Sequence, residues 1–320
     1  MKKPVILVSA VSGDIGSAAV RSIKEAGYVI VGCDIKPYSS VSCLMIRHYQ
    51  VPPASDTESY LNCLKNILKT EGIEMFLPIS EPEIDVLNQC REEMELTGIK
   101  LLINNRTIID NFSDKLKTIW YLESIGVKVP KTVSLKLYDG SFGFPVIVKA
   151  AKGCGSKRLW KIADERELEY IRHKDDGSLI AQEYIGSDDE DFTTGIFSDG
   201  KKVSSITFRR TLGYGGLSVE AFLTEEPFLE AMALRIAHET GLVGSINLQS
   251  RRVGNIFMPY EINPRLSSTL LFRKKFGFDD AVWWVQTIED NGYLYTYERK
   301  YRSGKALRGL SEYYFDLEEA

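Results

Sequence analysis

Short apolar runs alternate with amphipathic segments at the start of the chain. A β-branched run at 4–8 is followed by a glycine-containing turn at 12–16, an amphipathic segment at 18–26 and a second apolar run at 28–33. A short apolar run bounded by turn residues is typical of a buried strand, whereas helical spacing is typical of an amphipathic helix. The pattern predicts a strand, helix and strand of one parallel sheet over residues 4–34.

The same alternation continues through the next seventy residues. Helices are expected at 59–70 and 82–96, and strands at 75–79 and 101–103. Helices that connect parallel strands cover the faces of the sheet. Residues 1–105 are therefore predicted to form a small doubly wound α/β domain.

The rest of the chain mixes helices with strands that pair as hairpins. Helices are expected at 111–123, 165–173 and 227–240, and strands at 145–149, 159–162, 179–185, 192–197, 203–210, 244–250 and 256–262. The turn Ser198-Asp-Gly200 joins two of these strands as an antiparallel hairpin. The pattern predicts an α+β region with a linker helix at 106–124, two parts at 125–186 and 187–290, and a tail rich in tyrosine and arginine at 291–320.

Composition excludes several classes of function. The 320 residues include 26% charged and 44% hydrophobic residues with a formal net charge of −4, so we expect no general attraction for nucleic acid. Five cysteines without a CxxC pair and three scattered histidines argue against a disulfide framework, a thiolate metal cage and imidazole-based hydrolysis. No apolar run approaches the roughly 18 residues of a membrane helix, so we expect a cytoplasmic protein without a membrane partner.

The turn after the first strand partly matches a dinucleotide-binding fingerprint. Gly13 and Gly16 precede the helix, and Asp34 follows about twenty residues later, where such a fingerprint places its ribose carboxylate. The first glycine of the fingerprint is absent. The alternative is that both glycines only let a helix begin close behind a strand. The sequence favours this alternative over binding of NAD.

A loop rich in glycine and lysine follows the strand that ends at Lys149. The loop spans 150–157 and carries Gly153 and Gly155 between two lysines. Glycines let backbone N–H groups surround phosphate oxygens, and lysines add positive charge, although an ordinary solvated hairpin has the same composition. The strand at 182–185 could offer an adenine its backbone N–H and C=O groups, or could simply be a strand.

Polar side chains occupy alternate positions in the last two predicted strands. Asn247 and Gln249 share one strand, and Glu261 and Asn263 share the other. Alternate residues of a strand face the same side of a sheet, so these four side chains, termed the oxygen cluster, should meet across an antiparallel pair. Such oxygens suit Mg²⁺ or Mn²⁺ bridging phosphates. The alternative is an inert, buried hydrogen-bond ladder.

Taken together, these motifs resemble the ATP-grasp superfamily, and within it a single synthetase unit of the large subunit of carbamoyl phosphate synthase. The resemblance covers residues 4–275 and includes Asp114-Lys115 at the start of the linker helix. It implies a pre-ATP-grasp domain at 1–105, followed by an ATP-grasp domain with a small lobe at 125–186 and a large lobe at 187–290. It also implies ATP and Mg²⁺ as cofactors.

The resemblance further implies roles for individual residues. Contacts with ATP are implied for Lys115, Lys149, Gly153, Gly155, Ser156, Gln182, Glu183, Tyr184, Ile185 and Asp191, with Glu190 as an alternative to Asp191 at the ribose. Metal ligation is implied for Gln249, Glu261 and Asn263, and Lys149 and Arg265 are implied as catalytic residues, with Arg265 facing the γ-phosphate and the acyl phosphate. Many family members have an acid at the position of Gln249. Because the sequence has one unit and no repeat, we do not expect a complete carbamoyl phosphate synthase of the two-unit kind.

The resemblance implies an ADP-forming ligase that activates a small carboxylate as an acyl phosphate for attack by an amine. The glycine-rich segment 208–220 is expected to be the loop that holds the acceptor carboxylate, although its arginines could equally be a solvated pair on a hairpin edge. Candidate substrate residues are Arg209, Arg210, Glu220 and Asn247. We expect small-molecule partners and a homodimer.

A nucleotide-binding regulatory or assembly protein without turnover is the alternative function. The tail at 291–320 would then be its partner surface, because tyrosine and arginine are enriched where proteins bind one another. Packing of the tail on the body of the protein or on a second subunit is the simpler interpretation.

Overall fold

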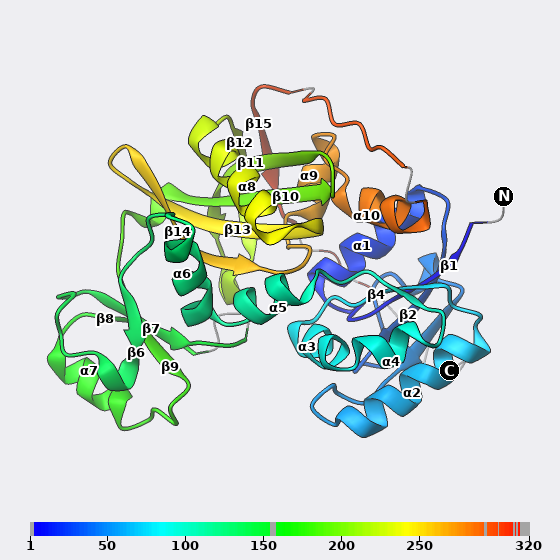
Figure 1. Cartoon of the computed structure of the whole chain (residues 1–320), viewed down its shortest axis with the longest axis horizontal. Helices are drawn as coiled ribbons and strands as arrows, with labels where there is room; N and C mark the ends of the chain where they lie inside the picture. The colour runs from blue at the N-terminus through cyan, green and yellow to red at the C-terminus, as the bar shows by residue number, and fades with distance from the viewer. Residues whose placement is uncertain are drawn as a thin grey trace.

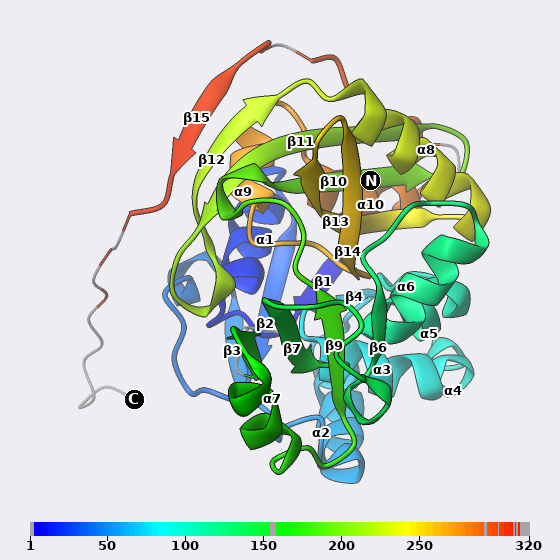
Figure 2. The ribbon, with the colours of Figure 1, turned by 90° about the vertical axis from the view of Figure 1, so that its left-hand side faces the viewer.

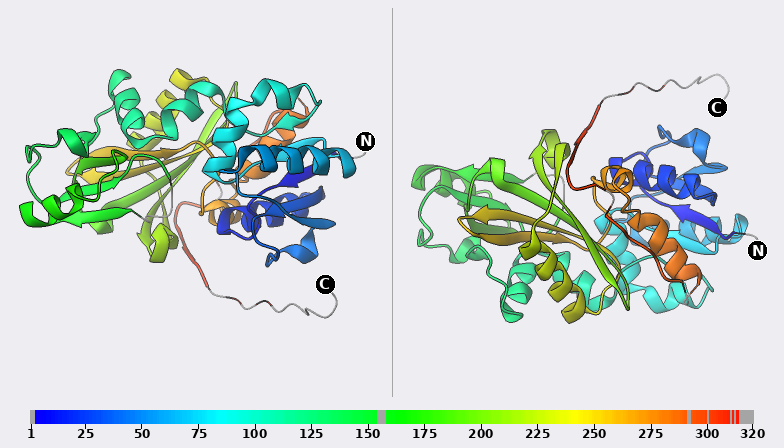
Figure 3. Two further views of the ribbon diagram at one scale, coloured as in Figure 1. Left: turned by 90° about the horizontal axis from the view of Figure 1, so that it is seen from below. Right: turned by 90° about the horizontal axis from the view of Figure 1, so that it is seen from above.

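A computed structural model describes residues 3–153, 158–290, 293–299 and 301–309, together with Ser311 and Tyr313. The described strands form three sheets, each accompanied by helices (Figure 1). The five-stranded and four-stranded sheets lie at opposite ends of the molecule, and the six-stranded sheet lies between them (Figure 3). The predicted fold class, a doubly wound domain followed by a two-lobed α+β domain, is confirmed.

The N-terminal sheet is parallel, with the strand order β3-β2-β1-β4-β5. Its elements are β1 (Val5–Val8), α1 (Asp14–Glu25), β2 (Val29–Asp34), β3 (Arg47–Gln50), α2 (Thr57–Thr70), β4 (Met75–Leu77), α3 (Glu81–Gln89), α4 (Arg91–Glu95) and β5 (Lys100–Leu101). Ile6 and Val8 pack into one buried cluster and Leu7 into another, so both faces of this sheet are covered. The predicted strand, helix and strand over residues 4–34 is confirmed.

Two details of this domain differ from the predictions. The helix expected at 82–96 is two helices, α3 and α4, which meet at Cys90. The parallel edge strand β3 was not predicted, because Arg47-His-Tyr-Gln50 is polar and lacks the apolar run that marks a buried strand.

The incomplete dinucleotide fingerprint has a structural explanation. Both side-chain oxygens of Asp34 accept backbone hydrogen bonds at 2.8 Å, one from Ser12 N and one from Lys36 N. A Cβ atom at Gly16 would lie 2.2 Å from the carbonyl oxygen of Ala10, so only glycine lets α1 begin so close to the turn. These contacts favour the structural interpretation of Gly16 and Asp34.

The expected single linker helix is a pair of helices, α5 (Arg106–Phe112) and α6 (Lys115–Ser124). The break between them arises at Asp114, whose carboxylate accepts a hydrogen bond from Leu116 N at 2.9 Å and so caps α6. Because the cap fixes where α6 begins, Lys115 occupies its first turn.

The small sheet is antiparallel, with the order β6-β9-β7-β8. Its elements are β6 (Thr132–Ser134), β7 (Val146–Ala150), β8 (Leu159–Ile162), α7 (Glu165–Arg172) and β9 (Leu179–Glu183). Leu168 and Ile171 of α7 are buried with Val146 and Val148 of the sheet. The helix therefore covers one face of this sheet, and the other face is left for the cleft described below.

The large sheet has the order β14-β13-β10-β11-β12-β15 and is antiparallel. Its elements are β10 (Asp191–Asp199), β11 (Val203–Leu212), β12 (Ser218–Thr224), α8 (Pro227–Thr240), β13 (Val243–Val253), β14 (Ile256–Asn263), α9 (Leu270–Lys275), α10 (Asp280–Glu289) and β15 (Gly304–Leu307). The expected loop at 208–220 is wrong in part, because β11 continues to Leu212 and β12 begins at Ser218. Within the described residues, no helix is both long and apolar enough to cross a membrane.

Candidate functional site

A cleft of about 810 Å³ is lined by residues from the small sheet, the large sheet and the first turn of α1. Most of the predicted site residues lie on it: Lys115, Lys149, Gly153, Gln182, Glu183, Tyr184, Ile185, Asp191, Arg210, Asn247, Gln249, Glu261, Asn263 and Arg265. Gly155 and Ser156, with the neighbouring Cys154, lie outside the described residues. The structure thus brings together residues separated by up to 150 positions.

Two of the predicted substrate residues are not among those that line the cleft in the described part of the chain. The guanidinium of Arg209 lies 5.1 Å from the ring centre of Phe222. The carboxylate of Glu220 is 2.5 Å from Lys305 Nζ on the edge strand β15. Residues alternate between the faces of a strand, so Arg209 and Arg210 face opposite sides of β11. Arg210 alone faces the cleft.

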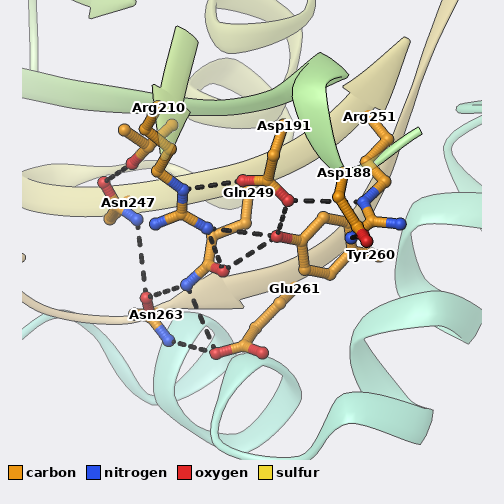
Figure 4. A network of polar contacts seen from close by, with 10 residues as sticks. Asp188, Asp191, Arg210, Asn247, Gln249, Arg251, Tyr260, Glu261 and Asn263 are labelled. Atoms are coloured by element: carbon orange, nitrogen blue, oxygen red, sulfur yellow. Dashed lines mark hydrogen bonds and ion pairs between the residues drawn. The ribbon is translucent and has the colours of Figure 1, made fainter. Parts of the chain in front are cut away.

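The oxygen cluster forms as the alternation in sequence predicts (Figure 4). Asn247 lies opposite Asn263, and Gln249 lies opposite Glu261, across the antiparallel pair β13 and β14. Asn263 donates from Nδ2 to Glu261 Oε1 at 2.8 Å, and Gln249 donates from Nε2 to Asn263 Oδ1 at 3.0 Å. The hydroxyl of Thr193 donates a hydrogen bond to Asn247 Oδ1 at 2.9 Å. These bonds fix the side chains before any ligand arrives.

A β-bulge beside the cluster adds one further side chain. The register of β13 and β14 shifts between Gln249 and Ser250, so that Gln249 faces Glu261 but Ser250 faces Pro259. Tyr260 is the extra residue, and bulges commonly re-aim a side chain in this way. Its hydroxyl donates to Asp191 Oδ2 at 2.8 Å (Figure 4).

The carboxylate of Asp191 is the centre of a buried polar network. Arg210 donates from Nε to Asp191 Oδ1 at 2.7 Å, and Arg251 approaches Asp191 Oδ2 at 3.4 Å. Burial disfavours the charge of Arg210, but the neighbouring Tyr260 and Asp191 outweigh burial and raise the pKa of the guanidinium. Asp191 and Arg210 therefore form a buried ion pair, and most of their polar atoms already have hydrogen-bond partners within the protein.

This network also determines how Gln249 is oriented. Its Oε1 accepts a hydrogen bond from Arg210 Nη2 at 2.8 Å and lies 3.2 Å from the hydroxyl oxygen of Tyr260. Its Nε2 is consequently the atom that faces Glu261 and Asn263. In this arrangement Gln249 orients the other members of the oxygen cluster, and Glu261 is the cluster's one carboxylate.

Lys149 reaches the cleft from β7 of the small sheet. Its side chain is 5% exposed, and its Nζ donates to Gln182 Oε1 at 2.9 Å. Gln182 is fixed in turn by donating to the hydroxyl of Thr132 at 2.9 Å. Burial is the main reason that the pKa of Lys149 falls to about 8, and the negative charge of Glu261 opposes this fall.

Glu261 remains a carboxylate although it is partly buried. Burial raises its pKa, but Lys115, Lys149 and the hydrogen bond from Asn263 together hold the pKa below the ordinary value of a glutamate. One anionic oxygen donor thus faces two lysines that come from different elements. Such a site has separate places for a cation and for the anionic oxygens of a ligand.

Lys115 links α6 to the segment that leads into the glycine loop. Its backbone N–H donates to the carbonyl of Ala151 at 2.8 Å, and its Nζ donates to the carbonyl of Gly153 at 2.8 Å. Asp114 and Lys152 form an isolated bridge between the same two segments. The first turn of α6 therefore holds the described start of the loop at the mouth of the cleft.

The far end of the cleft is formed by the end of β9 and the residues that follow it. Arg251 donates to the carbonyl of Ile185 at 3.3 Å and to Asp188 at 2.6 Å. The ring of Tyr184 lies between two cations, with Lys161 at 3.8 Å and Arg251 at 5.2 Å from its centre. Flat, amphipathic surroundings of this kind suit a heteroaromatic ring.

Arg265 approaches the cleft from the segment after β14. Its Nη2 donates to Glu81 Oε1 at 2.7 Å, and its Nη1 donates to the carbonyl of Leu266 at 2.9 Å. Glu81 is the first residue of α3 in the N-terminal domain. The arginine predicted to face phosphate is therefore positioned by a carboxylate from the other domain.

Two family models match consecutive parts of the chain. One describes a PylC-like N-terminal domain and matches residues 6–102, and the other describes an ATP-grasp domain and matches residues 112–269. The second match includes Lys149, Glu261 and Arg265. Residues 112–269 form an ATP-grasp domain. The small and large sheets are thus the two lobes of an ATP-grasp domain, and the cleft lies between them.

The curated relatives that match are large chains of carbamoyl phosphate synthase. The protein from Saccharolobus solfataricus is 26% identical over 231 residues, which are 66% of this chain and 22% of that protein. The protein from Myxococcus xanthus is 24% identical over 282 residues, which are 80% of this chain and 25% of that protein. The chain thus spans about a quarter or less of the length of these relatives.

Solved structures share the fold at low sequence identity. A biotin carboxylase from Campylobacter jejuni in complex with β-γ-ATP has a TM-score of 0.73 at 21% identity, covering 92% of this chain and 72% of that one. An L-amino acid ligase from Bacillus licheniformis has a TM-score of 0.71 at 14% identity, covering 90% of this chain and 74% of that one. Both comparisons extend the ATP-grasp fold over most of the chain.

Several residues of the ATP-grasp cleft escaped the sequence analysis. Arg251 continues the alternation of Asn247 and Gln249 along β13, so the same spacing could have identified it. Tyr260 could not be found by alternation, because the bulge places it out of phase. Asp14 and Ile15 also line the cleft, which shows that the first turn of α1 contributes to it.

Proposed function

We propose that this chain is an ATP- and Mg²⁺-dependent ligase. It activates a small carboxylate as an acyl phosphate, which an amine or another nucleophile then attacks, releasing phosphate and giving an amide-type product beside ADP. The observation that carries the proposal is that Lys149 and Glu261, from the two lobes of the ATP-grasp domain, lie in one cleft with opposite charges that influence each other's pKa. A cation and a phosphate chain can be bound there together.

The donor set fits Mg²⁺. Within the described residues, no three His, Cys, Asp or Glu side chains gather as a metal site. The oxygen cluster instead offers the carboxylate of Glu261 and the amide oxygen of Asn263, which are hard donors of the type that Mg²⁺ takes from protein while phosphates supply others. The ion would neutralise charge on the transferred phosphoryl group.

The remaining residues of the cleft would position ATP and neutralise the charge of its phosphates. Lys149 and Lys115 supply positive charge for phosphate oxygens, and Arg265 faces the same space from the segment after β14. The backbone from Gln182 to Ile185 would frame the adenine. Asp191 is proposed at the ribose, although its oxygens already accept bonds from Arg210 and Tyr260. Phosphoryl transfer requires mainly this kind of positioning and electrostatic stabilisation.

The acceptor carboxylate needs a cationic partner in the cleft. Arg209 and Arg210 are the predicted candidates, but Arg209 is not among the residues that line the cleft, and the guanidinium of Arg210 is bonded to Asp191, Gln249 and Tyr260. We propose that Arg265, with Asn247 nearby, serves the acyl phosphate instead. A solved structure with the same fold is that of an L-amino acid ligase, which is consistent with a carboxylate as substrate.

Positional exchange of ¹⁸O within labelled ATP tests the proposal. Exchange that requires a carboxylate and proceeds without an amine is expected from a reversible acyl phosphate step. The assay is run beside a Cys154→Ser variant, because a thiol near lysines could act covalently instead. Exchange that survives the substitution supports direct acyl phosphate chemistry, whereas a folded variant without any activity would indicate a thioester.

The same assay separates the ligase from its rival. A regulatory or assembly protein would bind MgATP without exchange or ADP release for any carboxylate in a broad panel of small acids. Two further expectations stay predictions. A homodimer would be recognised by light scattering of the purified chain, and a cytoplasmic location by fractionation of the producing cells.

A further inference from the structure

Five acidic side chains line the cleft within the described residues, and Asp14 differs from the other four. No hydrogen bond or ion pair joins its carboxylate to a described residue, and its Oδ2 is also shielded from solvent. A partly buried negative charge without a partner is unfavourable, so a donor supplied by a ligand would stabilise it. The other four carboxylates already accept hydrogen bonds within the protein: Glu183 from Lys131 N, Asp188 from Arg251, Asp191 from Arg210 and Glu261 from Asn263.

The helix that carries Asp14 explains only part of this arrangement. Asp14 is the first residue of α1, where the helix dipole favours a negative charge. Glu58 satisfies the same preference in the first turn of α2, yet it is exposed and is not among the residues that line the cleft. The dipole therefore accounts for an acid at position 14, but not for its place in the cleft with one shielded oxygen.

The topology of the N-terminal sheet places Asp14 where open α/β sheets bind ligands. In the order β3-β2-β1-β4-β5, the chain passes from β1 to β2 on one side and returns to β4 on the other side of β1 (Figure 2). Such a reversal leaves a crevice outside the carboxyl ends of the two adjacent strands. The helices α1 and α3 follow β1 and β4, so their first residues, Asp14 and Glu81, lie at this crevice. Glu81 binds Arg265, which lines the cleft as Asp14 does.

Two segments of the ATP-grasp domain complete this end of the cleft. Arg308 donates to the carbonyl of Ser218 at 3.1 Å and to that of Ser268 at 2.5 Å, so the start of β12 lies beside the segment before α9. Leu217 and Ser268 of these segments line the cleft together with Ile15. Because Ile15 and Leu217 are partly exposed, the cleft also offers apolar surface to a carbon chain.

We propose that Asp14 binds the primary ammonium group of a substrate, with the carbon chain of that substrate against Ile15 and Leu217. An ammonium group supplies both the hydrogen bond and the counter-charge that the carboxylate lacks. The group belongs either to the amine nucleophile or to the carboxylate substrate itself. The proposal rests on the ligase function proposed above, and it assigns the residue that distinguishes a charged amino group from an uncharged group of similar size.

Binding of two small probes to the full chain tests this role without ATP turnover. Propylammonium and 1-propanol are similar in size and differ in charge, and saturation-transfer NMR measures the Kd of each. We expect the parent protein to bind propylammonium about ten-fold more tightly, because the cation adds a charge-assisted hydrogen bond. Asp14→Asn should lose this preference and still bind 1-propanol, which shows that the cleft is intact.

Glu58→Gln is the matched control, because it also removes an acid from the first turn of a helix in the same domain. This variant should keep the preference for propylammonium. Equal binding of the two probes by the parent protein would overturn the assignment. An unchanged preference in Asp14→Asn would do the same, because the cation would then bind elsewhere.

Positional exchange of ¹⁸O in labelled ATP identifies which substrate carries the ammonium group, because exchange needs the carboxylate but not the amine. If the amine carries it, exchange in Asp14→Asn stays at the parent rate, and the KM for propylamine as the nucleophile rises severalfold. If the carboxylate substrate carries it, exchange itself falls severalfold. Both results support the assignment, and no change in either quantity would overturn it. Absence of exchange with every acid would contradict the ligase function, whereas the probe-binding result would stand by itself.

Discussion

Arg265 of the ATP-grasp domain and Glu81 of the N-terminal domain form an ion pair of 2.7 Å across 184 positions of sequence. Their side chains are only 10% and 12% exposed. Arg265 lines the cleft, and Glu81 is the first residue of α3, where a capping box formed by Ser80 and Glu83 fixes the start of the helix. The N-terminal domain thus contributes to the cleft by holding an arginine of the other domain in place.

Replacement of Glu81 by Gln is expected to lower kcat while leaving the Kd for MgATP unchanged. Arg265 keeps its charge but loses the carboxylate that orients it, and we expect a loss of about ten-fold, which corresponds to about 1.4 kcal/mol of barrier. Glu92→Gln is the matched control, because Glu92 forms an exposed pair with Arg106 on the same domain. Equal ADP release rates from the two variants would contradict a positioning role for Glu81.

The oxygen cluster predicts the strongest loss of turnover. Glu261→Gln and Asn263→Ala are expected to lower kcat by about 100-fold or more, because they remove donors to an ion that neutralises developing charge. Circular dichroism should show an intact fold. Glu220→Gln serves as the control, since Glu220 pairs with Lys305 away from the cleft. If both cluster variants stayed fully active at limiting Mg²⁺, the cluster would be an inert hydrogen-bond ladder.

The pKa of Lys149 predicts how ATP binding depends on pH. Its folded-state pKa is about 8, so the side chain is charged below that pH and loses its charge as the pH rises through it. The Kd for MgATP should therefore be constant near neutral pH and rise by up to about ten-fold per pH unit above the pKa. Lys149→Arg keeps its charge, and calorimetry should show a flat profile for it. The same rise in both proteins would assign the titration to another group.

Asp191 is predicted to be needed mainly for stability. Asp191→Asn leaves the buried Arg210 without its counter-charge, and breaking a buried pair in this way costs about 3–5 kcal/mol of unfolding free energy. Asp189 is an exposed neighbour, so the free energy of unfolding of Asp189→Asn should stay within about 0.5 kcal/mol of that of the parent protein. Urea denaturation measures both. A variant that is as stable as the parent but binds MgATP poorly would show that Asp191 serves the ribose without stabilising the fold.

The parts of the site that follow strand alternation could be predicted from the sequence. Asn247, Gln249, Glu261 and Asn263 meet as expected, because the period of a strand fixes the face of each side chain once the pairing of the strands is guessed. The order of the domains could also be predicted from the sequence, because apolar runs and turn residues mark each element locally.

The rest of the site depends on contacts that no local pattern records. The partner of Arg265 is 184 residues away, and the partner of Arg210 is Asp191 on the adjacent strand. Arg209 and Arg210 looked equivalent in sequence, and only the pairing of β11 determines which one faces the cleft. The bulge makes Tyr260 an extra residue of β14, so its place on the cleft face could not be assigned from spacing alone.

A thermal-shift series with nucleotides tests the central claim, that this cleft binds MgATP, most directly. A ligand bound only by the native state stabilises it by about 2.7 kcal/mol at a concentration of 100 times its Kd. MgATP should therefore raise the Tm of the parent protein, with a smaller rise for Lys149→Ala and Glu261→Gln. NAD and NADP should leave the Tm unchanged, because both oxygens of Asp34 are already bonded to backbone N–H groups. Stabilisation by NAD without stabilisation by MgATP would contradict the account.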